Sequence, residues 1–394
     1  MKSDTRLHHL DWLRVLAFGL LIFYHTGMLY VTWPFHVKSP RLVPGVEWAM
    51  VLANPWRLAL LFFVSGVASR FLIGKLGPVR FARDRFGRLF PALLFGMLVV
   101  VPPQAWFELA TRGRFAGGYL EFWTRHYLVA DRSVGTIVPT WNHLWFLVYL
   151  LFYCFVLAAL AAGWRGRRAL ECPTPALLVA PGLWLAAANV LASEWRPDTH
   201  AFVGDWAGHL RWIGLFVAGL LAARSDRFWE AVRTRRRALA GAALALALAF
   251  VGVRAALHAG WVGDRWDGPV YALSSAAFGW TTILALLGLA SEHLNRPSPA
   301  LSYLNVAILP VYMLHQTVLI ALGVLLFPLR LPLALEGGLV VAGTFAACLL
   351  LYELAIRRVA VLRFCFGLKR RDAPTAAPSR AAVISAGGSP RAAR

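Results

Sequence analysis

Long apolar stretches alternate with short polar breaks along most of the chain. An α-helix needs about 20 such residues to cross the hydrocarbon core of a bilayer. The pattern predicts ten crossings, at residues 10–31, 48–73, 89–110, 144–163, 175–194, 210–224, 238–258, 270–292, 301–327 and 332–356. The predicted fold class is therefore all-α, a polytopic transmembrane helical bundle.

The same pattern divides the chain into three parts. Residues 1–9 form a short N-terminal segment, residues 10–365 form one transmembrane domain, and residues 366–394 follow it. This last part is rich in Ala, Ser, Pro and Gly and poor in large apolar side chains, so it cannot bury a core. We expect it to be a disordered tail.

Composition excludes most soluble folds. Of the 394 residues, 59% are hydrophobic and 15% are charged, whereas soluble domains contain about 25% charged residues. The formal net charge is +21, which in a soluble protein would suggest nucleic-acid binding. In so apolar a chain the excess of Lys and Arg indicates membrane orientation instead, and we expect no nucleic-acid partner.

The positions of Lys and Arg predict that orientation. Ten crossings place both termini on one side, and 26 of the 40 Lys and Arg fall on that side against 10 on the other. The positive-inside rule therefore places both termini in the cytoplasm.

The first predicted helix carries ionisable residues along one face. Its sequence LDWLRVLAFGLLIFYHTGM contains Asp11, Arg14 and His25. The eleven positions from Arg14 to His25 end about 20° from three full turns, with a rise of about 16 Å. Ionisable groups in hydrocarbon normally face a bundle interior or a wet cavity and mark a functional path. The alternatives are an ion pair between Asp11 and Arg14, and a single hydrogen bond from His25 to a neighbouring helix.

Two further histidines are predicted at a similar depth. His143 opens the fourth helix and His315 lies midway along the ninth, but depth alone does not bring them together. An imidazole can take a proton from a hydroxyl near neutral pH and return it, which suits acyl transfer to an alcohol. Because no HExxH motif or short histidine spacing occurs, zinc is the weaker interpretation, and we predict no metal site.

A basic segment, GKLGPVRFARDRFGRLFP, follows the second helix. Together with the end of that helix it contains Arg70, Arg85 and Arg88. Guanidinium groups bind phosphate bidentately, and Arg85 and Arg88 share a helix face if the third helix begins early. The alternative is that the segment is basic for topology and for contact with anionic lipid.

Phosphate binding on the inside and proton transfer on the outside would suit a donor with a phosphorylated head and a long arm that ends in a thioester. Coenzyme A has this shape. Arg57 and Arg70 could line the same path, although Arg70 could also anchor the inner interface. Trp141 and Trp145 could stack on sugar rings or belong to an aromatic belt. Glu353 could recognise the donor or simply pair with Arg357 four residues later.

Several motifs resemble the membrane acyltransferase 3 family. HLDWLRVLAFGLLIFYHTGM, FFVSG, RFGRLFP, HLWFLVYLL and PVYMLHQ follow one another in the expected order over about residues 8–365. The opening block and the closing LYELAIRR are most similar to the branch that succinylates periplasmic glucans. The resemblance implies that His25 is the catalytic histidine, that Arg14 is its partner along the path, and that Arg85 and Arg88 bind the donor.

The predicted function is that of an O-acyltransferase in the bacterial inner membrane. It would move a succinyl or acetyl group from cytoplasmic acyl-CoA, its co-substrate, to hydroxyls of a periplasmic or cell-surface glycan, with no tightly bound cofactor. Direct transfer and an acylated histidine both stay open. Its partners would be the donor, the glycan, the lipid bilayer and separate glycan-synthesis proteins. The alternative is a proton-coupled exporter of a glycan or lipid-linked sugar.

The residues assigned to this function form four groups. Catalytic residues are His25 and Arg14, donor-binding residues are Arg85, Arg88 and Arg70, supporting residues are His143, His315, Asp11 and Glu353, and glycan-contact residues are Trp141 and Trp145.

Overall fold

The computed structural model describes residues 7–163, 172–195 and 199–369, and over these residues the chain is helical, without a strand. Residues 366–369 end against α3 (Pro78–Phe95). The rest of the predicted disordered tail, and the first six residues, lie outside the described residues.

The described ranges contain nine helical spans that are long and apolar enough to cross a membrane. A tenth is possible if α8 (Trp206–Ala222) and α9 (Asp226–Thr234), which meet at 102°, count as one crossing. The predicted multi-pass helical bundle is confirmed. The spans are α1 (His8–Tyr30), α2 (Val46–Leu76), α3 continued by η1 (Gly96–Val100) and α4 (Pro102–Thr111), α6 (Trp145–Gly163), α7 (Thr174–Trp195), α10 (Arg236–His258), α11 (Asp264–His293), α12 (Pro299–Leu326) and α13 (Leu333–Leu351) with η6 (Tyr352–Ile356).

Shorter helices complete the described chain. They are α5 (Tyr119–Phe122), η2 (Trp123–Tyr127), η3 (Arg132–Val134), η4 (Asn142–Leu144), η5 (Phe327–Leu329) and α14 (Ala360–Cys365). Four of them lie between α4 and α6, so the connection between these two helices folds into short helical turns.

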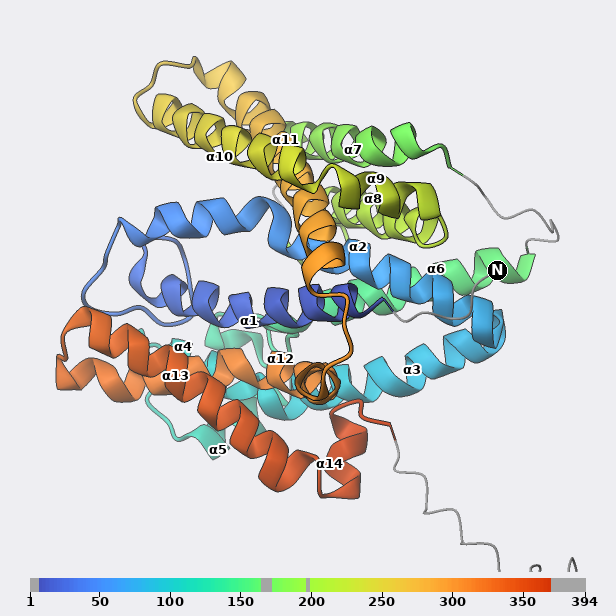
Figure 1. Ribbon diagram of the computed structural model, residues 1–394. Coiled ribbons are helices and arrows are strands. Elements are labelled where there is room, and N and C mark those ends of the chain that lie inside the picture. Colours follow the sequence, from blue (N-terminus) through green and yellow to red (C-terminus); the bar gives the residue numbers. More distant parts are fainter. Residues whose placement is uncertain (1–6, 164–171, 196–198, 370–394) are drawn as a thin grey trace, which may run out of the picture.

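Helix α2 lies near the middle of the bundle. Figure 1 shows α7 and α10 above α2 and α1, α12 and α13 below it, while α11 runs down across α2 and contacts α1 as well. Helix α2 contacts α8, α1 and α11. The described start of the chain and the described end lie toward the end of the bundle where α2 turns into α3 (Figure 1). That this end faces the cytoplasm stays a prediction of the charge pattern.

The third helix begins at Pro78 instead of residue 89, so the predicted start is wrong. Helix α2 ends at Leu76 and is followed by Gly77, whose φ of +74° lies in the left-handed region that glycine adopts without strain. Pro78 then opens α3 at a position where its missing N–H costs nothing. The first half of α3 is polar, and an apolar window cannot detect it. Arg85 and Arg88 therefore lie on one helix, three residues apart and on the same face.

Two glycines let α2 and α8 cross closely. A Cβ atom at Gly66 would lie 2.0 Å from the carbonyl oxygen of Phe216, and one at Gly219 would lie 2.0 Å from that of Phe63. Small residues at such crossings allow two helix backbones to approach in a membrane protein. Both helices also contribute residues to the wall of the cavity described below.

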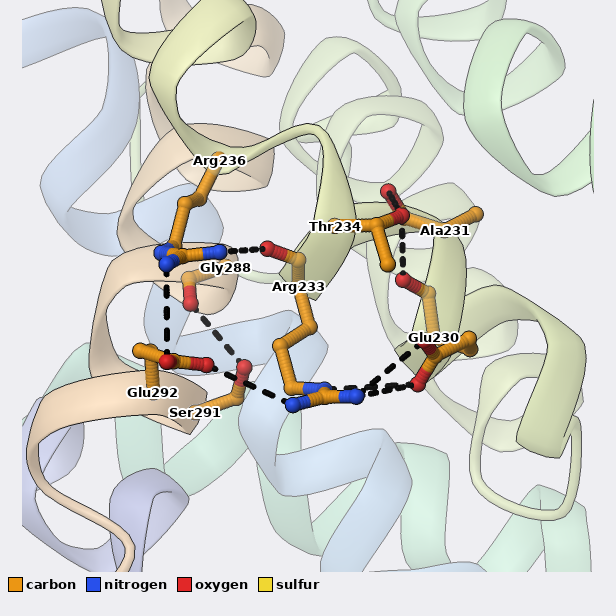
Figure 2. Close-up of polar contacts among 8 residues, drawn as sticks. All are labelled: Glu230, Ala231, Arg233, Thr234, Arg236, Gly288, Ser291 and Glu292. Carbon is orange, nitrogen blue, oxygen red and sulfur yellow. Dashed lines mark hydrogen bonds and ion pairs between the residues drawn. The ribbon is translucent and has the colours of Figure 1, made fainter.

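Ion pairs connect α9 and α10 to the end of α11, as Figure 2 shows. Arg233 pairs with Glu230 at 2.9 Å and with Glu292 at 3.5 Å, and Arg236 pairs with Glu292 at 3.4 Å. Such exposed pairs contribute little individually. Together they orient α9 after the sharp bend from α8.

Lys38 stabilises the end of α1. Its ammonium donates hydrogen bonds to the carbonyl oxygens of Met28 at 2.7 Å and Trp33 at 2.9 Å, and to that of Val31. These include carbonyls that have no donor once the helix ends. Burial lowers the pKa of Lys38. The loop that follows α1 is thereby fixed against the helix that carries His25.

Candidate functional site

A cavity of about 960 Å³ lies among α1, α2, α6, α7, α8, α11 and α12. Residues of the connection between α4 and α6 and of the segment before α8 also line it. The volume is that of a pocket for a small molecule or for part of a larger one. The cavity is therefore a candidate binding site for a substrate.

The three predicted histidines meet beside this cavity. The Nδ1 atom of His25 lies 2.9 Å from the Nε2 atom of His315. The rings of His315 and His143 are 5.2 Å apart at an angle of 87°. His25 and His143 line the cavity. The sequence predicted a common depth, and the structure adds the lateral contact.

Hydrogen-bond partners assign the proton on each neutral ring. The Nδ1 atom of His315 lies 2.6 Å from the carbonyl oxygen of Tyr312, which can only accept, so Nδ1 carries the proton. The Nε2 atom of His315 then accepts a hydrogen bond from Nδ1 of His25. In this arrangement the lone pair of His25 lies on Nε2, for which the described residues provide no hydrogen-bond partner. The Nε2 atom of His25 is thus left as a hydrogen-bond acceptor on a residue of the cavity wall.

His143 is held from two sides. Its Nε2 atom donates to the carbonyl oxygen of Met313 at 3.0 Å, and its Nδ1 atom lies 3.3 Å from the amide nitrogen of Gln104. Gln104 is fully buried and also binds Thr317 at 2.7 Å and Gln316 at 3.0 Å.

Sequence reasoning missed this glutamine. The single amide in the apolar segment VPPQAWF is a weak signal, because its burial and its partners become visible only when α12 is packed against it.

Prolines explain how the connection after α4 is fastened beside the cavity. Pro102 and the proline after it have no N–H, so carbonyls in the preceding turn lack helical donors. The hydroxyl of Tyr127 donates to the carbonyl oxygen of Met97 at 2.8 Å, and the indole of Trp123 donates to that of Leu98 at 2.8 Å. Burial raises the pKa of Tyr127 to about 12, so its hydroxyl stays a donor.

Asp131 closes a turn in the same connection. Its carboxylate accepts from the backbone N–H of Ser133 at 2.8 Å and lies 2.7 Å from Nδ1 of His126. Hydrogen bonds from Ser133 and His126 hold the pKa of Asp131 down, at about 2. The turn is therefore intact at neutral pH.

Aromatic side chains close the cavity on the side of Arg14. The ring of Phe18 lies 4.9 Å from that of Tyr312 and 6.1 Å from that of Phe146, and all three line the cavity. Arg14, one turn before Phe18, is not among the described residues that line it. The predicted path from Arg14 to His25 is interrupted by this aromatic floor in the present conformation.

Arg14 has partners of its own. It forms an ion pair with Asp11 at 3.5 Å and donates to the side-chain oxygen of Asn305 on α12. The ion pair offered as the simpler explanation for Asp11 is therefore present. These contacts connect α1 to α12 on the far side of the aromatic floor from His25.

The two tryptophans both line the cavity but differ in their surroundings. Trp145 is 8% exposed, and its ring stacks on that of His200 at 4.0 Å. The indole nitrogen of Trp141 donates to the carbonyl oxygen of His200 at 3.0 Å. One face of Trp145 is therefore covered by His200, and glycan contact by either tryptophan stays a prediction.

The three arginines predicted to bind the donor lie apart from the cavity. Arg85 lies over the ring of Phe81 at 5.4 Å, and its Nε atom is buried without a partner in the described part of the chain. Arg88 donates to the carbonyl oxygen of Gly367 at 3.1 Å. Neither these two nor Arg70 is a described lining residue. Donor binding by these three residues stays a prediction.

Glu353 is explained by its neighbour. It pairs with Arg357 at 2.7 Å, four residues later. The ordinary i,i+4 pair is present, and a role in donor recognition stays a prediction. Over residues 7–163, 172–195 and 199–369, no group of three or more His, Cys, Asp or Glu is arranged to hold a metal ion.

Comparison with known proteins adds the family. The model of the acyltransferase 3 family, described as an acyltransferase domain, matches residues 7–353. Curated proteins named glucans biosynthesis protein C, from Salmonella schwarzengrund and Salmonella agona, are each 25% identical over 403 residues. The match covers 96% of this chain and 98% of each relative. No solved structure matches the chain.

The helical spans, the buried histidine cluster and the family match lead to one assignment. The chain is a multi-pass membrane acyltransferase that belongs to the acyltransferase 3 family.

Proposed function

We propose that this acyltransferase moves an acyl group from a cytoplasmic thioester, acyl-CoA, to a hydroxyl of a periplasmic or cell-surface glycan. The relatives with near-complete coverage are named for glucan biosynthesis, which supports a glycan as the acceptor. The excess of Lys and Arg on one side supports an orientation with both termini in the cytoplasm, and the Salmonella relatives support a bacterial inner membrane. Separate glycan-synthesis proteins would supply the acceptor.

One observation carries the proposal. His25 lines a cavity of substrate size, and the bond from its Nδ1 atom to His315 leaves the Nε2 lone pair for a ligand. Nε2 takes the proton of the acceptor hydroxyl while the oxygen attacks the thioester carbonyl. The imidazolium then returns that proton to the leaving thiolate.

We assign roles to the predicted arginines and to Trp141 from their positions in the fold. Arg85, Arg88 and Arg70 bind the phosphates of the donor head on the inner side. Arg14 lies one turn before Phe18 on α1 and is not a described lining residue of the cavity, so we assign it to the donor arm instead of to charge at His25. The arm reaches the cavity when Phe18 moves. Trp141 contacts the glycan.

Mass spectrometry of periplasmic and envelope glycans tests the function. Cells that produce the wild-type chain should contain ester-linked acyl groups that cells without it lack. His25→Ala should abolish them, and His258→Ala should not, because His258 is outside the large cavity. Full ester content in the His25→Ala strain would exclude the assigned base.

Two further outcomes distinguish the open mechanisms. Protein incubated with labelled donor and no acceptor should stay unlabelled if transfer is direct, whereas label on His25 would establish an acylated intermediate. The exporter alternative predicts glycan transport without acyl transfer. The family assignment favours the enzyme.

A further inference from the structure

Arg57 is a buried cation at the wall of the cavity. It lies on α2, is 5% exposed and lines the cavity that His25 lines. Its Nη2 atom donates to the side-chain oxygen of Asn54 at 3.2 Å. Its Nε and Nη1 atoms have no hydrogen-bond partner in the described ranges. Two of its three nitrogens therefore carry N–H donors that no described group satisfies.

No described acid neutralises this guanidinium. The described residues that line the cavity include Arg57 and Arg211 but no Asp or Glu. The ring of Tyr24 lies 3.2 Å from the Cζ atom of Arg57. An aromatic face stabilises a cation, but it does not satisfy N–H donors. A buried charge without a hydrogen-bonded counter-ion is unfavourable, so the cavity is built to receive an anion.

Arg57 lies next to the reacting histidine. It stacks on Tyr24, the residue before His25 in α1, and all three line the same cavity. Arg14 is about 16 Å from His25 along the helix and lies beyond the aromatic floor. Negative charge that forms beside His25 is therefore within the reach of Arg57 and outside that of Arg14.

We propose that Arg57 is a further catalytic residue, which binds a negatively charged oxygen of the acyl group being transferred. This inference rests on the proposed function. The oxygen has two possible sources. One is the oxyanion that forms on the thioester carbonyl during attack, and the other is a permanent carboxylate at the far end of a dicarboxylic acyl chain.

The step is as follows. The acceptor hydroxyl oxygen bonds to the carbonyl carbon, its proton passes to Nε2 of His25, and the carbonyl electron pair moves to the oxygen held by Arg57. This electron pair then re-forms the C=O bond, and the C–S bond of the thioester breaks. The thiolate takes the proton from His25 and leaves as a thiol, and the acceptor carries the ester.

Acyl transfer by purified protein in nanodiscs tests the proposal. Acetyl-CoA and succinyl-CoA are compared as donors for the wild type, Arg57→Gln and Arg57→Lys. Arg254→Gln is the control, because this arginine lies over Tyr271 at 5.8 Å and is not a described lining residue of the large cavity. Removing one donor to an oxyanion typically slows turnover about 100-fold.

Comparison of acetyl-CoA with succinyl-CoA distinguishes the two possible sources of the negatively charged oxygen. A loss of about 100-fold in kcat for Arg57→Gln with both donors would identify the oxyanion. A loss confined to succinyl-CoA, mainly in KM, would identify the carboxylate. Wild-type rates with both donors would overturn the proposal. If the wild type transfers neither acyl group, the proposed function fails and not only this inference.

Arg57→Lys covers the case in which Arg57→Gln does not fold. Lysine keeps the charge but lacks the planar fork of Nε and Nη1 donors, so the two residues are not equivalent at such a site. We expect its kcat to fall at least about 10-fold, with a thermal unfolding temperature close to that of the wild type. Unchanged turnover in a folded Arg57→Lys protein would overturn the proposal.

Discussion

The Nδ1 atom of His25 on α1 lies 2.9 Å from the Nε2 atom of His315 on α12, and 290 positions of sequence separate the two residues. His315 is itself bound through Nδ1 to the carbonyl oxygen of Tyr312. The backbone of α12 therefore sets the proton position on one ring, and that ring sets the proton position on the other.

This relationship predicts that His315 positions His25 without touching the substrate. His315→Leu removes the acceptor for Nδ1–H of His25, and we expect kcat to fall about 100-fold. His315→Gln offers an amide oxygen at a similar reach and should retain at least ten times more activity than His315→Leu, an order-of-magnitude expectation from keeping the hydrogen bond. Initial rates with KM for each substrate measure both effects.

One result would contradict the positioning role of His315. Equal rates for His315→Gln and His315→Leu, with equal thermal stability, would show that the hydrogen bond to His25 does not matter.

If Arg85 and Arg88 bind the donor, their substitution should weaken the binding of acyl-CoA and leave that of the glycan unchanged. Arg85→Ala and Arg88→Ala should each raise the KM for acyl-CoA about 10-fold, which is the loss of about 1.4 kcal/mol of charge-assisted hydrogen bonding. The KM for the glycan should not change. Arg83→Ala is the matched control, because it removes the same charge from an exposed position of the same helix. A KM for acyl-CoA in Arg83→Ala as high as in Arg88→Ala would indicate a general basic surface instead of a site.

The crossing of α2 and α8 predicts two intolerant glycines. Gly66→Ala and Gly219→Ala each place a methyl group 2.0 Å from a backbone oxygen, so we expect a loss of about 2 kcal/mol or more in unfolding free energy. Gly241→Ala and Gly252→Ala are controls on α10, where a Cβ atom meets nothing within 4 Å. These should be neutral or stabilising by up to about 1 kcal/mol. Thermal unfolding in detergent compares the four proteins.

The buried carboxylate of Glu336, near the start of α13, should contribute to stability together with Arg41. Glu336 is fully buried and accepts from Nη2 of Arg41 at 2.7 Å and from the hydroxyl of Tyr30 at 3.1 Å. Arg41→Met leaves the charge without its cation and should cost about 2 kcal/mol. Adding Glu336→Gln should restore part of that loss, which a double-mutant cycle of unfolding measures. Strict additivity would show that the two side chains do not interact.

Most of the helices were predictable because their signal is local. The apolar length that places α1 at His8–Tyr30 is written in consecutive residues, and the predicted span at 10–31 differs from it only at the ends. The start of α3 was not predictable from hydropathy, because the first half of this helix is polar. Gly77 and Pro78 were the local signals that the apolar pattern overlooked.

The site was predictable only in part. Asp11, Arg14 and His25 were identifiable because ionisable residues in an apolar helix are rare and costly. Gln104 was missed, although it fastens His143, because a single amide in an apolar segment says little until its partners on α12 are known. The same holds for Arg57, whose missing counter-ion can be recognised only when every neighbour is in place.

The sequence by itself determined the multi-pass helical class, the approximate position of most apolar spans, the uneven distribution of Lys and Arg, and the ionisable residues within the first helix. These properties depend on residues a few positions apart and on the cost of leaving them in hydrocarbon. Only the tertiary structure decided that His25 meets His315, that Phe18 separates Arg14 from the cavity, and that Arg57 faces the same space as His25. Those contacts depend on how distant helices pack against one another, and no local pattern specifies that packing.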